Sequence, residues 1–166
     1  MDAQRRLLNR YSKNTKSGTV TWIGVRPQRL IPMIPLDSVM ALETLGLEGD
    51  HRVDKTPDSG RQVSIISEEY IQQIEHFSGI SGIRPEQLRR NIVVKNINLT
   101  LLRHQHFTIG DALFEATALC HPCSRMDKTV GPGTLPAMLG HGGVCAKILK
   151  TGLIAVGDEV TIIPIE

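Results

Sequence analysis

Short strand-like segments separated by glycine and proline turns constrain the fold of this chain more than any other feature of its sequence. Residues 17–25 alternate polar and apolar side chains, which is the pattern of a half-buried β-strand. Further strand candidates occupy residues 61–66, 91–95, 107–109, 112–117 and 144–149, and residues 152–163 resemble a hairpin-like pair. Six or more short strands favour a mostly β fold whose sheet closes, or nearly closes, into a barrel, because closure removes exposed strand edges.

Only one segment has a convincing helical pattern. Ser67 offers an N-cap hydroxyl, and the two glutamates that follow it place carboxylates in the first turn of the predicted helix. Its apolar stripe consists of Tyr70, Ile71, Ile74 and Phe77. The helix ends near Gly79, and a shorter helical turn begins at Pro85. We therefore expect a β-barrel-rich α+β domain with one or two short helices.

Length and composition indicate a single domain. With 166 residues and 40% hydrophobic content, the chain can bury one good core. Residues 1–16 form a basic N-terminal segment, whose cations are Arg5, Arg6, Arg10, Lys13 and Lys16. Such a segment is typical of a mitochondrial-type address or a phosphate-binding arm, but a solvated, flexible terminus is the simpler interpretation. We assign residues 17–166 to the folded domain.

Charge and cysteine content limit the partners and the compartment. A formal net charge of +2 is too small to indicate a nucleic-acid partner. The sequence contains no apolar run of membrane length, so we expect no membrane partner. Three cysteines form no disulfide framework and leave at least one thiol free, which agrees with a reducing compartment. A cytoplasmic protein is expected.

The segment Cys120-His121-Pro122-Cys123, with Arg125 shortly after it, concentrates reactive side chains, because neighbouring positive charge increases the thiolate fraction. Its Cys-x-x-Cys spacing allows a dithiol redox couple, although the residues that follow lead into a loop rather than the usual helix. Together with His141 and Cys145, the two thiols also supply the ligand types of a tetrahedral zinc site. A third interpretation treats the cysteines as small buried hydrophobic residues, and for Cys145 alone this one is favoured.

An ordered series of segments resembles one known family. These segments are residues 46–51, 62–69, 88–94, 110–115, 122–123, 142–144 and 152–160. Together they resemble the MOSC domain, the family of molybdenum-cofactor sulfurase C-terminal domains, over about residues 17–164. No single segment is specific, and the resemblance lies in their order. It implies a small stand-alone member with a MOSC fold, which is similar to the pyruvate-kinase barrel.

The resemblance also implies a molybdenum cofactor of the molybdopterin type, with Cys123 as the reactive or molybdenum-ligating residue. In amidoxime-reducing members the corresponding thiolate is a molybdenum ligand. In sulfurase-type members the domain binds the cofactor or carries sulfur as a persulfide. A soft thiolate suits both roles. Cys120 departs from the usual single-cysteine pattern, and it either resolves a persulfide as a disulfide or has no role.

Five further residues are candidates for binding the cofactor. Arg89 and Asn91 match an Arg-x-Asn element that helps to hold the cofactor in amidoxime-reducing relatives, although Arg89 also fits an ordinary solvated cation. Ser67 lies where a strand meets a helix N-terminus, which favours an anion and is compatible with capping. His51, in a loop with glycine, either contacts cofactor or substrate or belongs to a simple turn. Arg61 is a weaker phosphate or thiolate partner.

These features together favour reduction of N-hydroxylated small molecules at a molybdenum atom ligated by Cys123. A separate electron-donor protein is expected, because the chain has no motif for a flavin, a haem or an iron–sulfur cluster. The main alternative is a carrier of molybdenum cofactor or of persulfide sulfur, without turnover of its own, that meets a cofactor-handling protein. A zinc-stabilised binding module is the alternative from another class.

Overall fold

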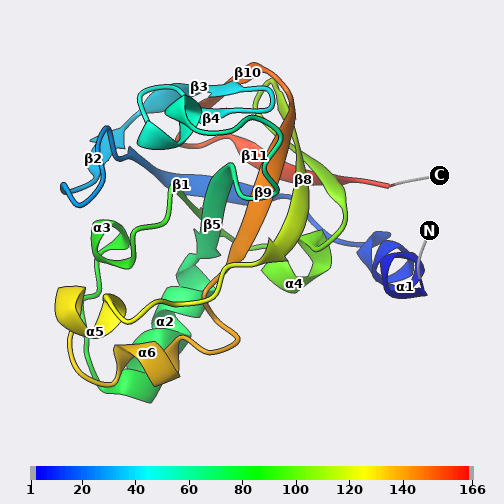
Figure 1. Ribbon diagram of the computed structural model, residues 1–166. Helices are drawn as coiled ribbons and strands as arrows, with labels where there is room; N and C mark the ends of the chain where they lie inside the picture. The colour runs from blue at the N-terminus through cyan, green and yellow to red at the C-terminus, as the bar shows by residue number, and fades with distance from the viewer. Residues whose placement is uncertain (1–2, 165–166) are drawn as a thin grey trace.

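The computed structural model describes residues 3–164 and contains a closed seven-stranded β-barrel (Figure 1). Neighbouring strands follow the order β11-β7-β8-β9-β5-β6-β1, and β1 pairs with β11 to close the circle. The barrel strands are β1 (Gly18–Val25), β5 (Val63–Ser67), β6 (Ile92–Lys95), β7 (His106–Ile109), β8 (Ala112–Leu119), β9 (Val144–Lys150) and β11 (Glu159–Ile163). This architecture confirms the predicted β-barrel fold.

Four short strands lie outside the barrel. β2 (Ile34–Leu36) pairs with β1 and contains Pro35, in agreement with an edge position. The other three, β3 (Ser38–Leu42), β4 (Gly46–Leu47) and β10 (Gly152–Ala155), form a separate sheet at one end of the barrel (Figure 1).

The hairpin predicted for residues 152–163 is wrong, because β10 pairs with β3 whereas β11 pairs with β7 and β1. A tight turn separates the two strands. In this turn the Asp158 carboxylate accepts a hydrogen bond from the backbone N–H of Ala155 at 2.8 Å. The chain therefore passes from the small sheet into the barrel instead of folding back on itself.

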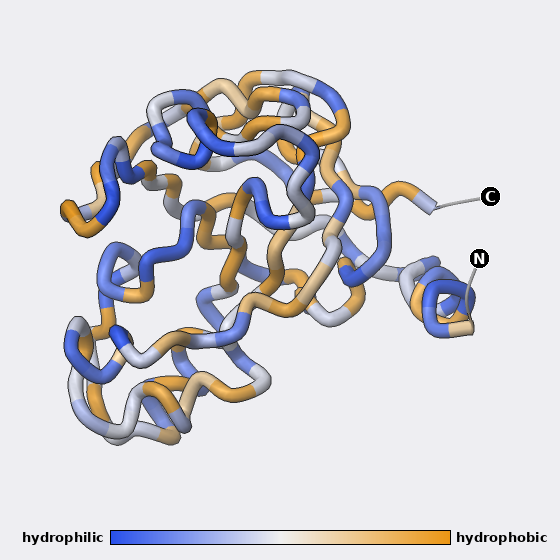
Figure 2. The backbone as a smooth tube through the Cα atoms, viewed as in Figure 1, coloured by the Kyte–Doolittle hydropathy of each residue, from blue (hydrophilic) through white to orange (hydrophobic). Residues whose placement is uncertain are grey.

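Aliphatic side chains from all seven strands fill the barrel. Along β7 buried and partly exposed residues alternate, as expected for a strand with one face toward the core. The rings of Phe107 and Phe114, from the adjacent strands β7 and β8, stack with centroids 5.4 Å apart. Figure 2 shows hydrophobic segments running through the barrel and through the helical region below it.

The described residues include six α-helices, against the one or two expected. Apart from α1 (Ala3–Ser12) and α2 (Glu68–Ser78), they are single turns: α3 (Pro85–Leu88), α4 (Leu99–Leu102), α5 (Met126–Thr129) and α6 (Thr134–Ala137). A four-residue helix is too short to show a 3.6-residue period, so the sequence pattern does not reveal it. One 3₁₀ turn, η1 (His51–Asp54), also occurs.

Helix α2 begins and ends as its sequence predicts. The Ser67 hydroxyl accepts a hydrogen bond from the backbone N–H of Tyr70 at 3.1 Å, and Gly79 closes the helix in the left-handed conformation with φ 73°. Ile71 and Ile74 are buried in a second core beside the barrel. Helices α3, α5 and α6 gather around α2 on one side of the barrel, and α1 lies apart from them (Figure 1).

The parallel pair β5 and β6 brings two distant segments together. Helix α2 connects these strands, and Ile65 pairs with Ile92. Because β1 pairs antiparallel with β6, the end of β1 lies beside the beginnings of β5 and β6. Polar residues at these strand ends therefore face a common edge of the barrel.

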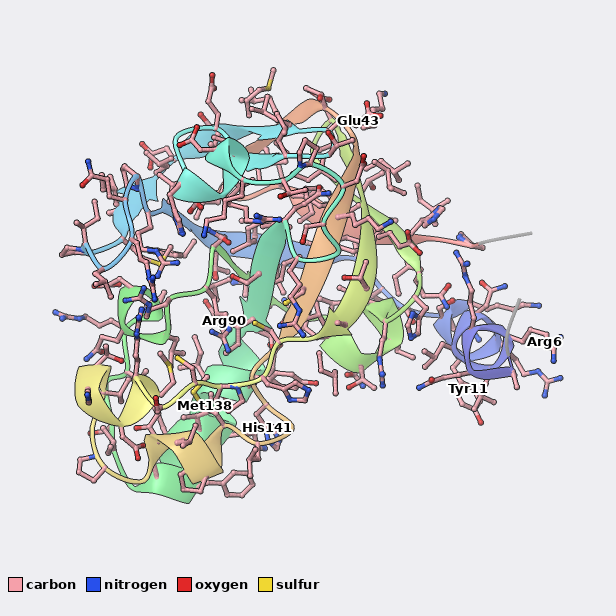
Figure 3. The ribbon with its side chains drawn as sticks, in the orientation of Figure 1. Arg6, Tyr11, Glu43, Arg90, Met138 and His141 are labelled. Atoms are coloured by element: carbon pink, nitrogen blue, oxygen red, sulfur yellow. The ribbon has the colours of Figure 1, made fainter. Side chains whose placement is uncertain are left out.

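Most of the basic N-terminal segment is helical in this structure. Helix α1 spans Ala3–Ser12 and lies beside α4, and the Arg5 guanidinium is 4.0 Å from the Glu115 carboxylate. Arg6 and Tyr11 point away from the barrel (Figure 3). None of the helices within residues 3–164 has the length and apolar character needed to cross a membrane.

Candidate functional site

A polar pocket of about 240 Å³ opens at the barrel edge where β1, β5 and β6 meet. The loops before η1 and after β8 complete its wall. Its lining includes five residues that carry the chemistry: Arg61, Arg89, His51, Cys120 and Cys145. Residues from five separate parts of the chain thus converge on one depression.

Four guanidinium-bearing residues, Arg26, Arg52, Arg61 and Arg89, line this pocket. The carboxylate among its lining residues, Asp50, is only 6% exposed. Asp50 accepts hydrogen bonds from the backbone N–H groups of Arg26 at 3.0 Å and Arg52 at 2.9 Å, so its charge stabilises the loop. The pocket is therefore strongly cationic and suited to an anionic ligand.

Asn91 holds the floor of the pocket together. Its side-chain oxygen accepts hydrogen bonds from the backbone N–H and the hydroxyl of Ser64, both at 3.1 Å. Its amide nitrogen donates to the Gly24 carbonyl at 3.2 Å and to Asp50 at 3.1 Å. These four bonds use the full capacity of a carboxamide. In this structure Asn91 therefore positions the pocket by linking β1, β5 and the Asp50 loop.

Arg89 adopts an uncommon backbone conformation at the end of α3. Its φ of 58° lies in the left-handed region, where a side chain other than glycine is disfavoured. Such a conformation at a pocket wall is typical of functional positions. The turn places Arg89 in the lining of the pocket and buries the next residue, Arg90.

Arg90 is a buried cation, and its partners among the described residues are carbonyl groups. It is 6% exposed and donates hydrogen bonds to the carbonyl oxygens of Gly142 at 2.8 Å, Leu88 at 3.1 Å and Cys120 at 3.3 Å. In residues 3–164 no carboxylate forms an ion pair with Arg90. Figure 3 shows it between the barrel and the helices around α2. A buried cation without a counter-charge raises the local potential and favours a nearby anion.

Cys120 and Cys145 both line this charged wall, and neither is in a disulfide. A hydrogen bond from Cys145, followed by the positive charges of Arg90 and Arg61, outweighs burial and lowers the pKa of Cys120 to about 6. The same hydrogen bond, burial and the negative charge of Cys120 raise the pKa of Cys145. These interactions favour the thiolate at Cys120 and the thiol at Cys145.

Cys123 lies at the surface beside this pocket. Its side chain is exposed, and its carbonyl accepts a hydrogen bond from the backbone N–H of Met126 at 3.0 Å. A thiolate at Cys123 interacts electrostatically with Arg26, which lines the pocket. Among the described residues, Cys120 and Cys145 but not Cys123 form the pocket wall.

Of the candidate residues His51 and Ser67, only His51 lines the cationic pocket. His51 lines the cationic pocket, and its Nδ1 lies 3.0 Å from the Arg26 carbonyl oxygen and 3.3 Å from the Asp50 carboxylate. Ser67 lines another surface pocket, of about 390 Å³, beside Tyr70 and His141. The structure thus brings His51, Arg61, Arg89 and Asn91 together and places Ser67 apart from them.

The four residues considered as an alternative zinc site, Cys120, Cys123, His141 and Cys145, do not form a metal site among the described residues. His141 packs edge-on against the rings of Tyr70 and Phe77, with centroids 5.3 and 5.4 Å apart. Within residues 3–164, no group of three or more histidine, cysteine, aspartate or glutamate residues has an arrangement that could hold a metal ion.

Sequence reasoning missed Arg26 and Arg52, which line the pocket, and the buried Arg90, which bonds to the Cys120 carbonyl. Arg52 directly follows the matching segment 46–51, so its proximity to that segment was an available signal. Arg26 follows a predicted strand outside the matching segments, so it carried no such signal. Nothing in the local pattern distinguishes a buried Arg90 from a solvated one. For Cys145 the predicted burial is confirmed, since the residue is 5% exposed, but its thiol also contacts Cys120.

Comparison with known proteins agrees with this architecture. The family model of the MOSC domain matches residues 49–161, which include the Asp50 loop, β5, β6, the thiol segment and β9. No curated protein is significantly similar in sequence.

Solved structures share the fold at low sequence identity. The YuaD protein from Bacillus subtilis is 18% identical, with a TM-score of 0.78 and coverage of 91% of this chain and 98% of that one. YiiM from Escherichia coli is 17% identical, with a TM-score of 0.66 and coverage of 89% and 71%. YiiM from Geobacillus stearothermophilus is 15% identical, with a TM-score of 0.66 and coverage of 88% and 75%. At these identities the likeness concerns the fold alone.

Proposed function

The chain belongs to the MOSC domain family, and on this premise we propose that its cationic pocket binds a molybdenum cofactor of the molybdopterin type. One observation carries the proposal: four arginines from separate segments line one pocket, while the carboxylate of its lining is engaged by the backbone. A phosphate-bearing pterin fits this donor set, because guanidinium groups bind phosphate through paired, charge-assisted hydrogen bonds.

Each residue of the pocket has a part in holding such a ligand. Arg61 and Arg89 bind its anionic end, and Asn91 keeps the strands that carry them in place. Because the Nδ1 of His51 contacts the Arg26 carbonyl, its Nε2 is the nitrogen that can exchange a proton with a ligand. Ser67 offers the N-terminus of α2 as a second anion site, at a distance from the arginines.

Cys123 is the proposed molybdenum ligand. Its thiol is exposed beside Arg26, whereas the thiols of Cys120 and Cys145 are engaged with each other. Thiolate sulfur is a soft donor suited to such a metal. When bound, the cofactor supplies two-electron oxygen-transfer chemistry. The activity that fits this chemistry is reduction of N-hydroxylated small molecules with electrons from a partner protein. We propose neither a nucleic-acid partner nor a membrane partner.

A second candidate function follows from the exposure of Cys123. An accessible thiol on a small domain can carry the cofactor or a persulfide sulfur to a cofactor-handling protein. A cofactor carrier would bind cofactor but show no turnover, whereas a persulfide carrier would bear sulfur on Cys123 and need not hold cofactor. The enzyme and the cofactor carrier therefore differ in activity and agree in cofactor content.

The experiment compares wild-type protein with Cys123→Ser, both produced in cells that make the cofactor. Molybdenum and pterin per chain are measured first, and then reduction of an amidoxime with a chemical reductant such as dithionite-reduced viologen. The enzyme proposal predicts turnover by wild type and loss of molybdenum and turnover in Cys123→Ser. Cofactor without turnover supports the cofactor carrier, and wild type without any cofactor contradicts both the enzyme and the cofactor carrier.

A further inference from the structure

We propose that Cys120 and Cys145 are a redox couple, which hydroperoxides oxidise to a reversible disulfide between β8 and β9 in the wall of the cationic pocket. This couple differs from the Cys120–Cys123 dithiol that the Cys-x-x-Cys spacing indicates. It is also independent of whether the pocket holds a molybdenum cofactor.

Strand register places the two sulfur atoms on the same face of the sheet. Ala118 on β8 pairs with Cys145 on β9, and the next pair is Leu119 with Val144. Cys120 lies two residues beyond Ala118, so its side chain points to the same side as that of Cys145. Its backbone N–H donates to the Gly143 carbonyl at 2.8 Å, which continues the ladder beyond the end of β8.

The glycines at positions 142 and 143 allow this close approach. A Cβ atom on Gly142 would collide with the Cys120 carbonyl, and one on Gly143 would collide with the Ile65 carbonyl. Gly143 also adopts a positive φ of 90°. The strand that carries Cys145 therefore enters the barrel tightly against the segment that carries Cys120, and both cysteines line the same pocket.

Charge makes Cys120 the attacking member of the couple. Arg90 is buried without a carboxylate partner in the described residues, and it acts electrostatically on Cys120 together with Arg61. A thiolate at Cys120 is the anion that this cation lacks. Cys145, which donates the hydrogen bond, is the protonated member and lies ready to resolve an oxidised Cys120.

Access to the couple is through the pocket. Cys120 is partly exposed and Cys145 is 5% exposed, and both line the pocket wall. A small hydroperoxide can reach Cys120 by this route, whereas a folded protein thiol cannot reach Cys145. This asymmetry favours an internal disulfide over mixed disulfides.

The reaction balances without a further co-reactant. The Cys120 thiolate attacks a peroxide oxygen, the O–O bond breaks, and hydroxide leaves with a sulfenic acid remaining on Cys120. The Cys145 sulfur then attacks the sulfenic sulfur, so that an S–S bond forms, the S–O bond breaks and water leaves. Two electrons pass from the thiols to the peroxide, and an external dithiol returns them during reduction.

Peptide mapping of the oxidised protein tests the proposal. Reduced wild type is treated with hydrogen peroxide, blocked with N-ethylmaleimide and digested with trypsin without a reductant. Cys120 and Cys123 fall in peptide 104–125, and Cys145 falls in peptide 129–147. The proposal predicts a linked pair of these two peptides, loss of two of the three thiols per chain, and recovery of both with dithiothreitol.

Two variants separate the possible linkages. Cys123→Ser should form the same linked pair, and Cys145→Ser should form none and should trap a dimedone-reactive sulfenic acid at Cys120. A disulfide within peptide 104–125 of wild type, a link between two chains, or overoxidised Cys120 without a link would overturn the proposal. In wild type, N-ethylmaleimide found on Cys123 within the linked peptide 104–125 assigns the disulfide to Cys120, whereas the label on Cys120 would assign it to Cys123 and overturn the proposal. This assignment does not depend on the folding of a variant.

Discussion

The Arg90 guanidinium donates a hydrogen bond to the Cys120 carbonyl oxygen at 3.3 Å, from a position that is 6% exposed. The same guanidinium acts electrostatically on the Cys120 thiol, so one buried cation both fixes the backbone of the thiol segment and favours the thiolate. This relationship links the helix α3 turn, which carries Arg89 into the pocket, to the cysteine segment across the barrel edge.

Replacing Arg90 with Met should slow alkylation of Cys120. Methionine fills a similar volume but removes the positive charge, so the pKa of Cys120 should rise and less thiolate should be present at pH 7. The measurement is the rate of iodoacetamide labelling at Cys120 between pH 5 and 9, in a Cys123→Ser background that leaves one accessible thiol. Arg84→Met, which changes an exposed arginine on the same segment, is the control. Identical pH profiles for both variants would show that Arg90 does not act on this thiol.

Stability should depend on pH through Cys120. Its pKa is about 6 in the folded protein, and an unfolded thiol titrates near about 8.5. The folded state therefore binds fewer protons between these values, and the stabilisation is complete above the unfolded pKa and is lost as the pH falls through about 6. We expect the Tm difference between wild type and Cys120→Ser to increase from pH 6 to pH 8.5. A difference that stays constant or decreases over this range is the contrary result.

Asn91→Ala should destabilise the protein by about 2–3 kcal/mol, because it leaves buried partners at Ser64, Gly24 and Asp50 without their hydrogen bonds. Urea unfolding measures the change in the free energy of unfolding. Asn98→Ala is the matched control, since that side chain caps α4 through one bond to Thr100 and should cost only about 1 kcal/mol. An equal decrease in the free energy of unfolding in both variants would show that Asn91 does not have this structural role.

Arg89→Gly should raise the free energy of unfolding by about 1 kcal/mol, because glycine adopts a φ of 58° without the steric cost that arginine incurs. The same change should weaken anion binding in the pocket. Chemical unfolding is compared with Arg89→Ala, which keeps the backbone cost and should not gain stability. A loss of stability in Arg89→Gly would contradict this expectation. It would mean that contacts of the Arg89 side chain stabilise the fold by more than its left-handed backbone conformation destabilises it.

The sequence allowed much of the fold to be predicted, because strand alternation and the capping signals at Ser67 and Gly79 are local. The pairing of β10 and β11 with different strands was not predictable in this way, since pairing depends on contacts between distant segments. Contacts between distant segments in the candidate site were likewise not predictable from local sequence patterns. The family resemblance located His51, Arg61, Arg89 and Asn91. Only the folded chain shows that the Asn91 carboxamide bonds to Ser64 and Asp50 and so holds the pocket wall together.

The three cysteines show most clearly that sequence spacing does not predict which residues are neighbours in the fold. Cys145 lies 25 residues after Cys120, and no spacing rule pairs them, yet strand register brings them into contact. Cys120 and Cys123 are close in sequence and have different surroundings, one in the pocket wall and one at the surface. Burial and charge, rather than spacing, distinguish the three thiols.

Pterin content per chain in Arg89→Ala tests the central claim, that the arginine-lined pocket holds the cofactor, most directly. Wild type, Arg89→Ala, Arg89→Lys and the exposed control Arg84→Ala are produced in cells that make the cofactor, and released pterin is measured by fluorescence. A charge-assisted phosphate contact is worth about 1.5–3 kcal/mol, so cofactor affinity in Arg89→Ala should fall by about 10- to 100-fold, with partial recovery in Arg89→Lys. We expect wild-type pterin content in Arg84→Ala and a marked loss in Arg89→Ala. Equal pterin content in all four proteins, or none in wild type, would contradict it.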